Sequence, residues 1–344
     1  IGFDTDPLSV LLSNAWCMDV NEGQVRKAAQ KVLDSAKQSV KRLKDTNAYP
    51  CLPDDTETRQ FVDYWFDCMN RRQLTALSRA INKHSHKAVQ RILWCAFSKM
   101  IITKQASVSL AMDLSHSRPH RVREVSDIHP FDRYFSSVES VLDAAPFKST
   151  RSVGSAVIKC ADARKLPLPS ESIDLVVTSP PYLNAIDYLR GHKFTLVWMG
   201  YSIQSLRARR STIIGTEAGL YLSNDRKVPE IIDQMTGSQK LPRYQEGMLR
   251  QYVVDMSNVL AEITPVLIPG GKATLVVGNS TIRGVFVENS KAITLLGMEH
   301  GLKLISADSR VLPNNRRYLP PPSSGICALD NRMRTEVVVA LRKG

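Results

Sequence analysis

The sequence lacks any long run of apolar residues. Of its 344 residues 43% are hydrophobic, but no stretch reaches the about 18 uncharged apolar residues that a membrane-spanning helix needs. The opening residues also lack the charged start and apolar centre of a secretory leader. We therefore expect a cytoplasmic protein without a membrane partner, long enough for one large domain or for one domain that carries a sizeable insertion.

Cysteine is scarce, and it is scattered along the chain. The six cysteines stand at positions 17, 51, 68, 95, 160 and 327, without a Cys-x-x-Cys pair. That spacing is typical of reduced cysteines and not of a disulfide framework. His84, His86, His116 and His120 lack cysteine or carboxylate partners at ligand spacing, so we expect no metal site.

Acidic residues are outnumbered by basic ones. Lys and Arg number 46 against 33 Asp and Glu, which gives a formal net charge of +13. A positive excess suits a polyanionic partner such as nucleic acid. Many basic proteins bind no nucleic acid, however, so the motifs have to carry the functional argument.

The most informative motif consists of Ser179, Pro180, Pro181 and Tyr182, which directly follow the apolar run 173–178. Proline has a fixed φ and no N–H donor, so this turn leaves carbonyl oxygens as uncompensated acceptors. The exocyclic amino group of a nucleobase needs such acceptors, and an aromatic ring can lie against a flat base. The alternative is an ordinary strand exit, because paired prolines often end strands.

Two patterns organise the chain before this motif. Residues 1–15 predict the tail of a strand, an acidic turn and then a helix with Pro7 in its first turn. Asp4 follows the strand end, where an acid can accept both ribose hydroxyls of a nucleoside cofactor. Helix N-capping is the alternative for Asp4 and even more for Asp6. The second pattern is a helical insertion over residues 21–145, with helices at 24–43, 61–69 and 74–103 and a basic loop at 115–123.

From residue 156 onward the pattern alternates between strands and helices. The predicted elements are strands at 157–160, 173–178, 273–277, 302–312 and 335–341, a helix at 244–266 and a turn at 267–272. We expect the last two strands to form an antiparallel pair. Phe194 and Trp198 are expected in the core, and Asn279 either borders a pocket or caps a turn.

Residues 161–169 and 173–182 resemble the S-adenosylmethionine-dependent DNA methyltransferases that modify exocyclic amino groups. In that family a Ser/Asn/Asp-Pro-Pro-aromatic motif follows the fourth strand. The Ser form is most typical of cytosine-N4 enzymes, and the Asp and Asn forms are commoner among adenine-N6 enzymes. The resemblance implies an α/β fold, with a Rossmann-like class I methyltransferase sheet and a large helical insertion. Residues 1–20 and 146–344 would form the catalytic methyltransferase domain, and residues 21–145 a helical insertion for DNA or target recognition.

The resemblance also implies roles for the motif residues. Ser179 and the backbone carbonyl of Pro180 would accept the two hydrogens of the amino group. Pro181 would stiffen the turn, and Tyr182 would stack on the target base, which must be flipped out of the duplex or single-stranded.

For the cofactor S-adenosylmethionine, the resemblance places Asp4 on the ribose hydroxyls and Asp162, beside Ala163, on the adenine. A strand-end turn is the alternative for Asp162. The family's first strand and Gly-rich turn do not precede Asp4 here. We expect them upstream in a longer chain, outside the structure or on another polypeptide, and their true absence would impair cofactor binding. Asp187 and Tyr188 are weaker candidates for lining the site.

Contacts with DNA are expected from basic clusters, for which a solvated surface is the alternative. The candidates are Arg118, Arg121, Arg207, Arg209, Arg210, Arg316 and Arg317.

These features together predict an enzyme, a site-specific DNA methyltransferase that modifies the N4 amine of cytosine. A bacterial restriction-modification or defence system is the expected setting, with cognate restriction or defence proteins as further partners. One alternative is an adenine-N6 enzyme, and another is a methyltransferase of structured RNA, although no appended RNA-binding module is found. A third alternative is a catalytically silent nucleic-acid-binding subunit, which the missing Gly-rich turn favours.

Overall fold

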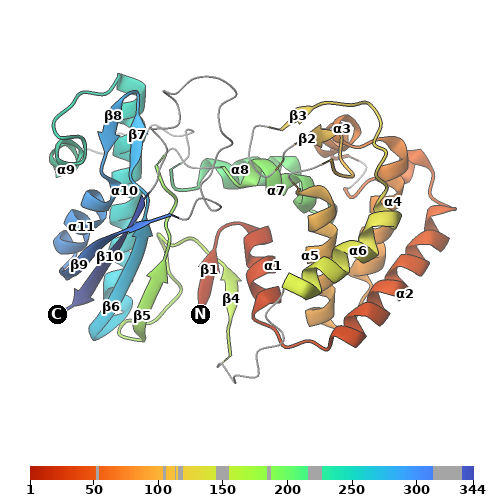
Figure 1. Cartoon of the computed structure of the whole chain (residues 1–344), viewed down its shortest axis with the longest axis horizontal. Coiled ribbons are helices and arrows are strands. Elements are labelled where there is room, and N and C mark those ends of the chain that lie inside the picture. Colours follow the sequence, from red (N-terminus) through yellow and green to blue (C-terminus); the bar gives the residue numbers. More distant parts are fainter. Residues whose placement is uncertain are drawn as a thin grey trace. The chain divides into compact units, whose positions relative to one another are not determined.

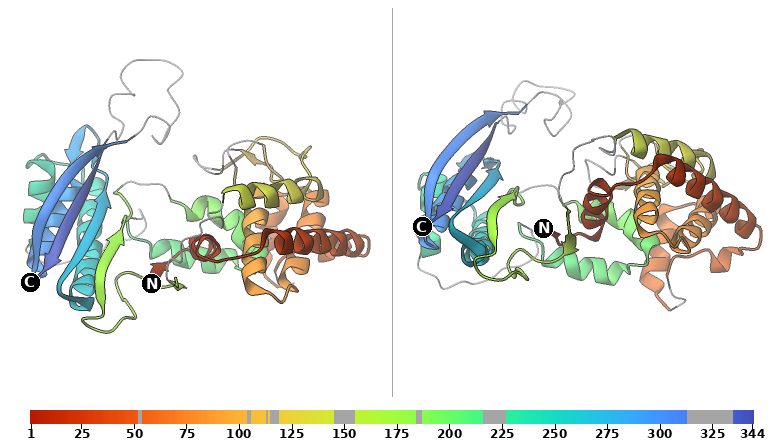
Figure 2. Two further views of the ribbon diagram at one scale, coloured as in Figure 1. Left: turned by 60° about the horizontal axis from the view of Figure 1, so that its bottom comes forward. Right: turned by 90° about the horizontal axis from the view of Figure 1, so that it is seen from below.

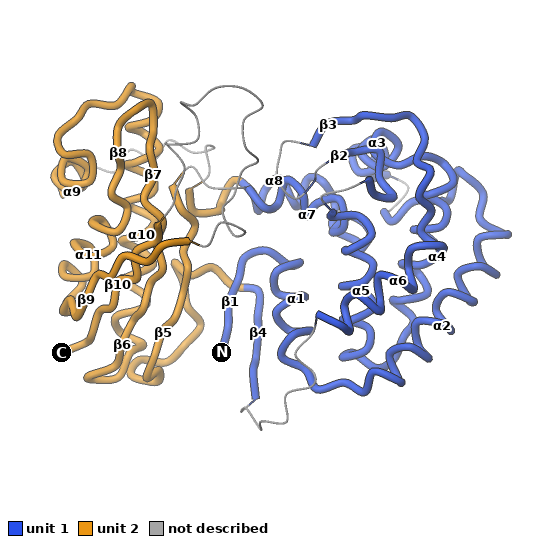
Figure 3. Tube along the Cα trace, in the orientation of Figure 1, with its two compact units in different colours: residues 1–160, 187–210 blue, residues 161–186, 211–344 orange. Residues whose placement is uncertain are grey.

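The computed structural model describes residues 1–51, 54–103, 106–112, 114, 119–144, 155–183, 187–215, 227–312 and 335–344. The chain divides into two compact units, shown in Figure 3. Unit 1 comprises Ile1–Cys160 and Asp187–Arg210, and unit 2 comprises Ala161–Ile186 and Ser211–Gly344. Helices and strands are both present, so the expected α/β class with a large helical part is confirmed.

Unit 1 is mainly helical (Figure 1). Its helices are α1 (Pro7–Trp16), α2 (Glu22–Val40), α3 (Thr56–Trp65), α4 (Cys68–Asn82), α5 (Lys87–Ile101), α6 (Pro130–Ala144), α7 (Leu189–Leu196) and α8 (Ile203–Ser211), with 3-10 turns at Asp45–Asn47 and Val197–Met199. A parallel pair joins β1 (Gly2–Asp4) to β4 (Ile158–Cys160), and an antiparallel pair joins β2 (Ala111–Met112) to β3 (His120–Arg121).

Short polar side chains begin several of these helices. Asp6, Asn21, Asp55 and Asp67 each accept a backbone N–H in the first turn of the helix that follows. This N-capping satisfies donors that the helix itself leaves without a partner. The apolar stripes behind the caps form the core of unit 1. Phe194 and Trp198 are 0% and 1% exposed there, which confirms their expected burial.

Unit 2 contains a four-stranded sheet in the order β5 (Ile173–Thr178), β6 (Leu267–Val277), β10 (Thr335–Lys343) and β9 (Leu302–Val311). Strands β5 and β6 are parallel, whereas β10 runs antiparallel to both of its neighbours. The helices are α9 (Lys227–Thr236), α10 (Arg243–Val266) and α11 (Asn289–Glu299), and β7 (Ser280–Ile282) pairs with β8 (Val285–Val287). The expected closing antiparallel pair is therefore confirmed as β9 and β10.

The two faces of this sheet differ in their covering (Figure 2). Leu275, Val339 and Leu341 are fully buried in one core with the apolar side of α10 and with α11. On β5, by contrast, Leu175 and Val177 are 55% and 67% exposed. Strand β5 is also an edge strand in the described part of the chain, since its one sheet partner there is β6.

Several predicted boundaries need correction. The pattern at 74–103 was one helical prediction, but the structure breaks it into α4 and α5, where His86 caps α5. The predicted turn at 267–272 already belongs to β6, because β5 pairs with this strand from Leu267 onward.

The compact units also follow other boundaries than the predicted domains. Residues 1–20 lie in unit 1, where β1 pairs with β4 and α1 packs on α5. Whether residues 1–20 and 146–344 act together in catalysis, with 21–145 as an insertion, stays a prediction.

Candidate active site at the diproline corner

The motif Ser179, Pro180, Pro181 and Tyr182, here called the diproline corner, lies directly after β5. Pro180 and the following Leu183 are buried, whereas Ser179 and Pro181 are exposed. Burial on one side anchors the turn, and exposure on the other leaves the serine hydroxyl accessible. Because β5 and β6 are parallel, their carboxyl ends meet at one edge of the sheet, which is where ligands bind in open α/β sheets.

The hydroxyl of Ser179 is oriented by the neighbouring strand. Its Oγ lies 3.2 Å from the carbonyl oxygen of Val276 and 3.4 Å from the hydroxyl of Tyr182. A serine hydroxyl has one hydrogen and two lone pairs. When its hydrogen is donated to the Val276 carbonyl, the lone pairs remain available to accept a hydrogen from a ligand.

The hydroxyl of Tyr182 is held by a residue of β10, which is two strands away from β5 in the sheet. This hydroxyl donates to Glu336 Oε1 at 2.9 Å, and Arg310 donates to Glu336 Oε2 at 2.7 Å and 3.0 Å. Glu336 and Arg310 are directly paired residues of β10 and β9. Burial raises the pKa of Tyr182, and the Glu336 carboxylate raises it further against the effect of Ser179, so the phenol stays protonated and can donate. Sequence reasoning missed Glu336, because the pairing is visible only once the strand register is known.

The predicted cofactor residue Asp162 lies in a loop that is fixed to α10. Arg164 donates to both carboxylate oxygens of Asp162 and, at 2.7 Å, to Oδ1 of Asp255 on α10. The backbone N–H of Leu166 donates to Glu262 of the same helix at 2.8 Å. Burial alone would raise the pKa of Asp162, but the hydrogen bonds from Arg164 outweigh it, and the pKa is lowered. Asp162 is therefore an ionised acceptor.

A short segment after α8 lies along both the Asp162 loop and the diproline corner. The carbonyl of Thr212 accepts a hydrogen bond from Arg164 at 2.5 Å. Gly215 has a φ of +77°, and a Cβ atom there would lie 3.7 Å from the carbonyl oxygen of Tyr182. Two parts of the predicted site are thus neighbours of one segment of unit 2. Ala163 is half-buried and packs against the core of this unit.

Asp4 belongs to the other unit. It ends β1 beside Cys160, and its Oδ1 accepts the backbone N–H of Asp6 at 2.8 Å. Partial burial raises the pKa of Asp4, and the negative charge of Asp6 adds to this effect against the backbone hydrogen bonds. Asp6 caps α1 through the N–H of Leu8 and pairs with His192 of α7. The capping role was one of the two alternatives for Asp6.

The predicted DNA contacts are only partly described. Arg118, Arg316 and Arg317 lie outside the described residues. Arg121 belongs to β3, and the other three candidates, Arg207, Arg209 and Arg210, belong to α8. Arg209 donates to the carbonyl of Thr5 at 3.2 Å and lies 3.3 Å from the sulfur of Cys160, so it supports the β1 and β4 strand ends.

The remaining candidates have structural partners. Asp187, a weak candidate for lining the site, forms ion pairs with Arg210 and Arg190. Tyr188 is 54% exposed. Asn279 accepts the backbone N–H of Ser290 at 3.1 Å, in the first turn of α11, and so has the capping role that was one of its two alternatives.

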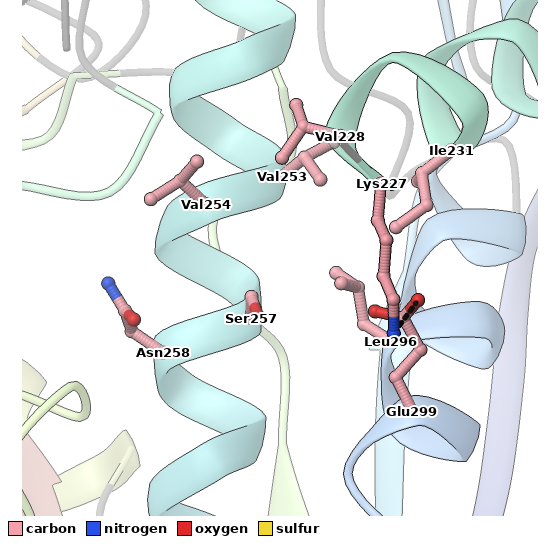
Figure 4. Close-up of a pocket in the computed structure, with 9 residues that line it drawn as sticks. All are labelled: Lys227, Val228, Ile231, Val253, Val254, Ser257, Asn258, Leu296 and Glu299. Atoms are coloured by element: carbon pink, nitrogen blue, oxygen red, sulfur yellow. Dashed lines mark ion pairs between the residues drawn. The ribbon is translucent and has the colours of Figure 1, made fainter. Parts of the chain in front are cut away.

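A small cavity of about 180 Å³ lies among α9, α10 and α11 (Figure 4). An ion pair of 3.4 Å between Lys227 and Glu299 crosses it, and none of the predicted site residues lines it.

No three His, Cys, Asp or Glu side chains of the described residues are grouped as a metal ion would need. In the same ranges, no helix has both the length and the apolar character of a membrane span.

No family model and no curated protein matches the chain. Among solved structures, the chain is similar to a Thermus thermophilus protein provisionally named a DNA modification methylase, with 17% identity over 53% of this chain and 50% of that chain and a TM-score of 0.27. A structure of that protein complexed with S-adenosyl-L-methionine matches at 18% identity over 53% and 51%, with a TM-score of 0.27. A structure described as one of the SAM-dependent methyltransferases, from Methanosarcina mazei, matches at 9% identity over 60% and 76%, also with a TM-score of 0.27. The chain spans about half the length of the Thermus protein. Similarities this low carry no argument about fold or function.

Proposed function

We propose that this chain is a DNA methyltransferase that uses S-adenosylmethionine and acts on an exocyclic amino group, with the N4 amine of cytosine as its target. The observation that carries the proposal is the accessible diproline corner at the carboxyl end of β5. There the hydrogen of Ser179 can be donated to Val276 within the protein, which directs an acceptor oxygen outward. The Ser form of the motif favours cytosine N4 over adenine N6.

The chemistry asked of this corner is orientation. The lone pair of an exocyclic amine is delocalised into the base, so the nitrogen is a poor nucleophile. Ser179 Oγ and the carbonyl of Pro180 accept its two hydrogens, which favours a pyramidal nitrogen and directs the lone pair out of the ring plane. The ring of Tyr182, held by Glu336, lies against the base. Positioning of this kind supplies most of the rate in an in-line displacement.

The acids fit the cofactor that the sequence resemblance implies. S-adenosylmethionine, when bound, supplies the methyl group that is transferred. A carboxylate has about four acceptor positions, and Asp162 uses three of them for Arg164 donors. One position remains for the amino group of the adenine. Asp4 accepts the backbone N–H of Asp6 and is partly exposed, which leaves acceptor capacity for two ribose hydroxyls.

The test is methyl transfer from labelled S-adenosylmethionine to duplex DNA. Ser179→Ala should lower the rate by roughly a hundredfold, the scale of losing one oriented hydrogen bond at a reacting centre, and should leave cofactor binding unchanged. Ser136→Ala on α6, which removes a serine hydroxyl far along the chain, is the matched control and should be fully active. Undiminished transfer by Ser179→Ala would contradict the proposal.

The identity of the base is read from the product. The methylated DNA is digested to nucleosides, and the modified nucleoside is identified by its mass and retention time. N4-methylcytosine is expected. N6-methyladenine would keep the enzyme class and replace the target, whereas cofactor binding without any methylated product would identify a silent subunit.

A further inference from the structure

One side of α3 carries a stripe of three side chains. Glu57, Phe61 and Tyr64 are separated by four and three residues, so they follow one another along the same side of the helix. The stripe is fixed within unit 1, because the backbone N–H of Ile203 at the start of α8 donates to Thr58 of α3 at 2.9 Å. The Phe61 ring also packs edge-on against the buried ring of Phe194 on α7, with the ring centres 5.1 Å apart.

Each member of the stripe holds a basic group from a different element. Arg207 of α8 forms an ion pair with the carboxylate of Glu57. Lys193 of α7 places its Nζ 5.2 Å from the centre of the phenylalanine ring, and Arg121 of β3 places its guanidinium carbon 5.3 Å from the centre of the tyrosine ring. We call Arg207, Lys193 and Arg121 the cationic row. Cation–π contacts of this kind hold a positive charge in place without neutralising it.

The region of the row has more basic than acidic groups. Arg190 and Arg210 stand beside it and both pair with Asp187. The row and its two neighbours thus contribute five basic side chains, and the ion pairs among them use two carboxylates, those of Glu57 and Asp187. Burial lowers the pKa of Lys193, and the nearby arginines lower it further. The side chains of Arg207 and Arg210 are 67% and 45% exposed, so solvent and ligands reach them.

We propose that the cationic row binds the sugar–phosphate backbone of DNA. Glu57 and Tyr64 are seven positions apart on α3, so the row follows the helix axis over about 10 Å. A line of held cations matches the line of charges along a nucleic-acid strand, whereas a small anion would need a single convergent cluster. The inference rests on the proposed function in one respect, that DNA is the substrate. It assigns the backbone contact to residues of unit 1, whereas the diproline corner belongs to unit 2.

The main experiment compares two triple variants that lose the same charge. In the first, Arg121, Lys193 and Arg207 are each replaced by Gln. In the control, the three exposed lysines of α2, Lys27, Lys31 and Lys37, are each replaced by Gln. Binding of a short fluorescein-labelled DNA duplex is measured by anisotropy at several salt concentrations. The row variant should bind at least tenfold more weakly, and the slope of log affinity against log salt should shrink by about 3, or about one for each lost phosphate contact. The control should bind like the unaltered protein. Equal weakening in both variants, or none in the row variant, would overturn the proposal.

Two smaller changes keep the test valid if the half-buried Lys193 proves necessary for folding. Arg207→Gln with Arg210→Gln alters only exposed side chains and should still weaken DNA binding severalfold, with a smaller salt slope. Tyr64→Ala should weaken binding because Arg121 loses its support, whereas Tyr64→Phe keeps the ring and should bind normally. Normal DNA binding by both the double variant and Tyr64→Ala would contradict the proposal. Binding of an RNA duplex of the same sequence by the unaltered protein, without binding of the DNA duplex, would contradict it as well.

The readouts separate this inference from the proposed function. If the row variants lose DNA binding but the unaltered chain never transfers a methyl group, the row stands and the proposed reaction fails. If methyl transfer occurs and the row variants keep the KM for DNA, the reaction stands and the row fails.

Discussion

The two acids that follow parallel strands, Asp4 after β1 and Asp162 two residues after β4, show how differently one sequence signal is used. Arg164 donates to Asp162 from its side chain and its backbone, and the pKa of that carboxyl is lowered. Asp4 accepts the backbone N–H of Asp6, and its pKa is raised by partial burial. The first acid is therefore fixed by protein partners, whereas the second keeps most of its acceptor capacity.

This difference separates positioning from binding. Asp162 gains its orientation from a guanidinium that is shared with Asp255, a buried side chain of α10 that is 4% exposed. The cost of disturbing Asp162 is thus mainly structural. For Asp4, which has fewer protein partners, we expect the cost to lie mainly in ligand affinity.

Removing the shared guanidinium should have the largest effect. Arg164→Ala leaves the buried carboxyl group of Asp255 without its ion-pair partner, and breaking such a pair costs about 3 kcal/mol or more. Urea unfolding followed by circular dichroism measures the loss. Arg250→Ala removes an exposed pair with Glu246 on the same helix and should cost under about 0.5 kcal/mol. Similar costs for both variants would show that Asp162 is not fixed in this way.

Asp4→Asn should mainly reduce cofactor affinity. Hydrogen bonds to a charged group contribute about 1.5–3 kcal/mol each, so losing the charge should weaken S-adenosylmethionine binding by tenfold or more in calorimetry. Asp162→Asn should weaken it less, because Arg164 already occupies three of the about four acceptor positions of Asp162 and only one is left for the cofactor. Asp19→Asn, an exposed acid elsewhere in unit 1, is the control and should leave affinity unchanged. A larger loss for Asp162 than for Asp4 would reverse the comparison.

Asp6 is a third acid in the same turn as Asp4, and we expect its role to be structural. Asp6→Ala removes the N-cap of α1 and should cost about 1 kcal/mol more than Asp6→Ser, which retains a capping oxygen. Both variants lose the pairing with His192, so their difference in thermal unfolding isolates the cap. Equal stability of the two variants would argue against capping.

The pH dependence of stability should have opposite signs for Asp4 and Asp162. This is the smallest of the four predicted effects. The ordinary pKa of both carboxyls is 3.8. Asp162, with its lowered pKa, stabilises the fold above pH 3.8, and this contribution is lost as the pH falls through the lowered value. Asp4, with its raised pKa, contributes stability below pH 3.8 that is lost as the pH rises through the raised value. Relative to Asp162→Asn, the unaltered protein should gain melting temperature as the pH rises through this range. Relative to Asp4→Asn, it should lose melting temperature over the same range.

The local part of the fold and of the site could be predicted from the sequence. The apolar run before Ser179 is β5, the strand and helix at the opening of the chain are β1 and α1, and the last two strands pair as expected. These elements have strong local patterns and clear ends, such as Pro7 in the first turn of α1 and the prolines after β5.

The long-range contacts could not be predicted. Arg164 reaches across 91 positions to Asp255, and Tyr182 reaches across 154 positions to Glu336. Such pairs depend on strand register and on the packing of α10, which no local pattern encodes. The break between α4 and α5 was missed for another reason: helical periodicity continues across residues 83–86, and only His86, an uncommon cap, signals the interruption.

The exposed strand β5 has a practical consequence for anyone who isolates unit 2. The side chains of Leu175 and Val177 are exposed to water. In the described structure, the outer edge of this strand has backbone N–H and C=O groups that no neighbouring strand pairs with. Such an edge is a template for intermolecular β-pairing. A preparation of residues 161–344, which contains unit 2 and the unit 1 segment Asp187–Arg210, should therefore aggregate at high concentration, and Val177→Lys should keep it soluble.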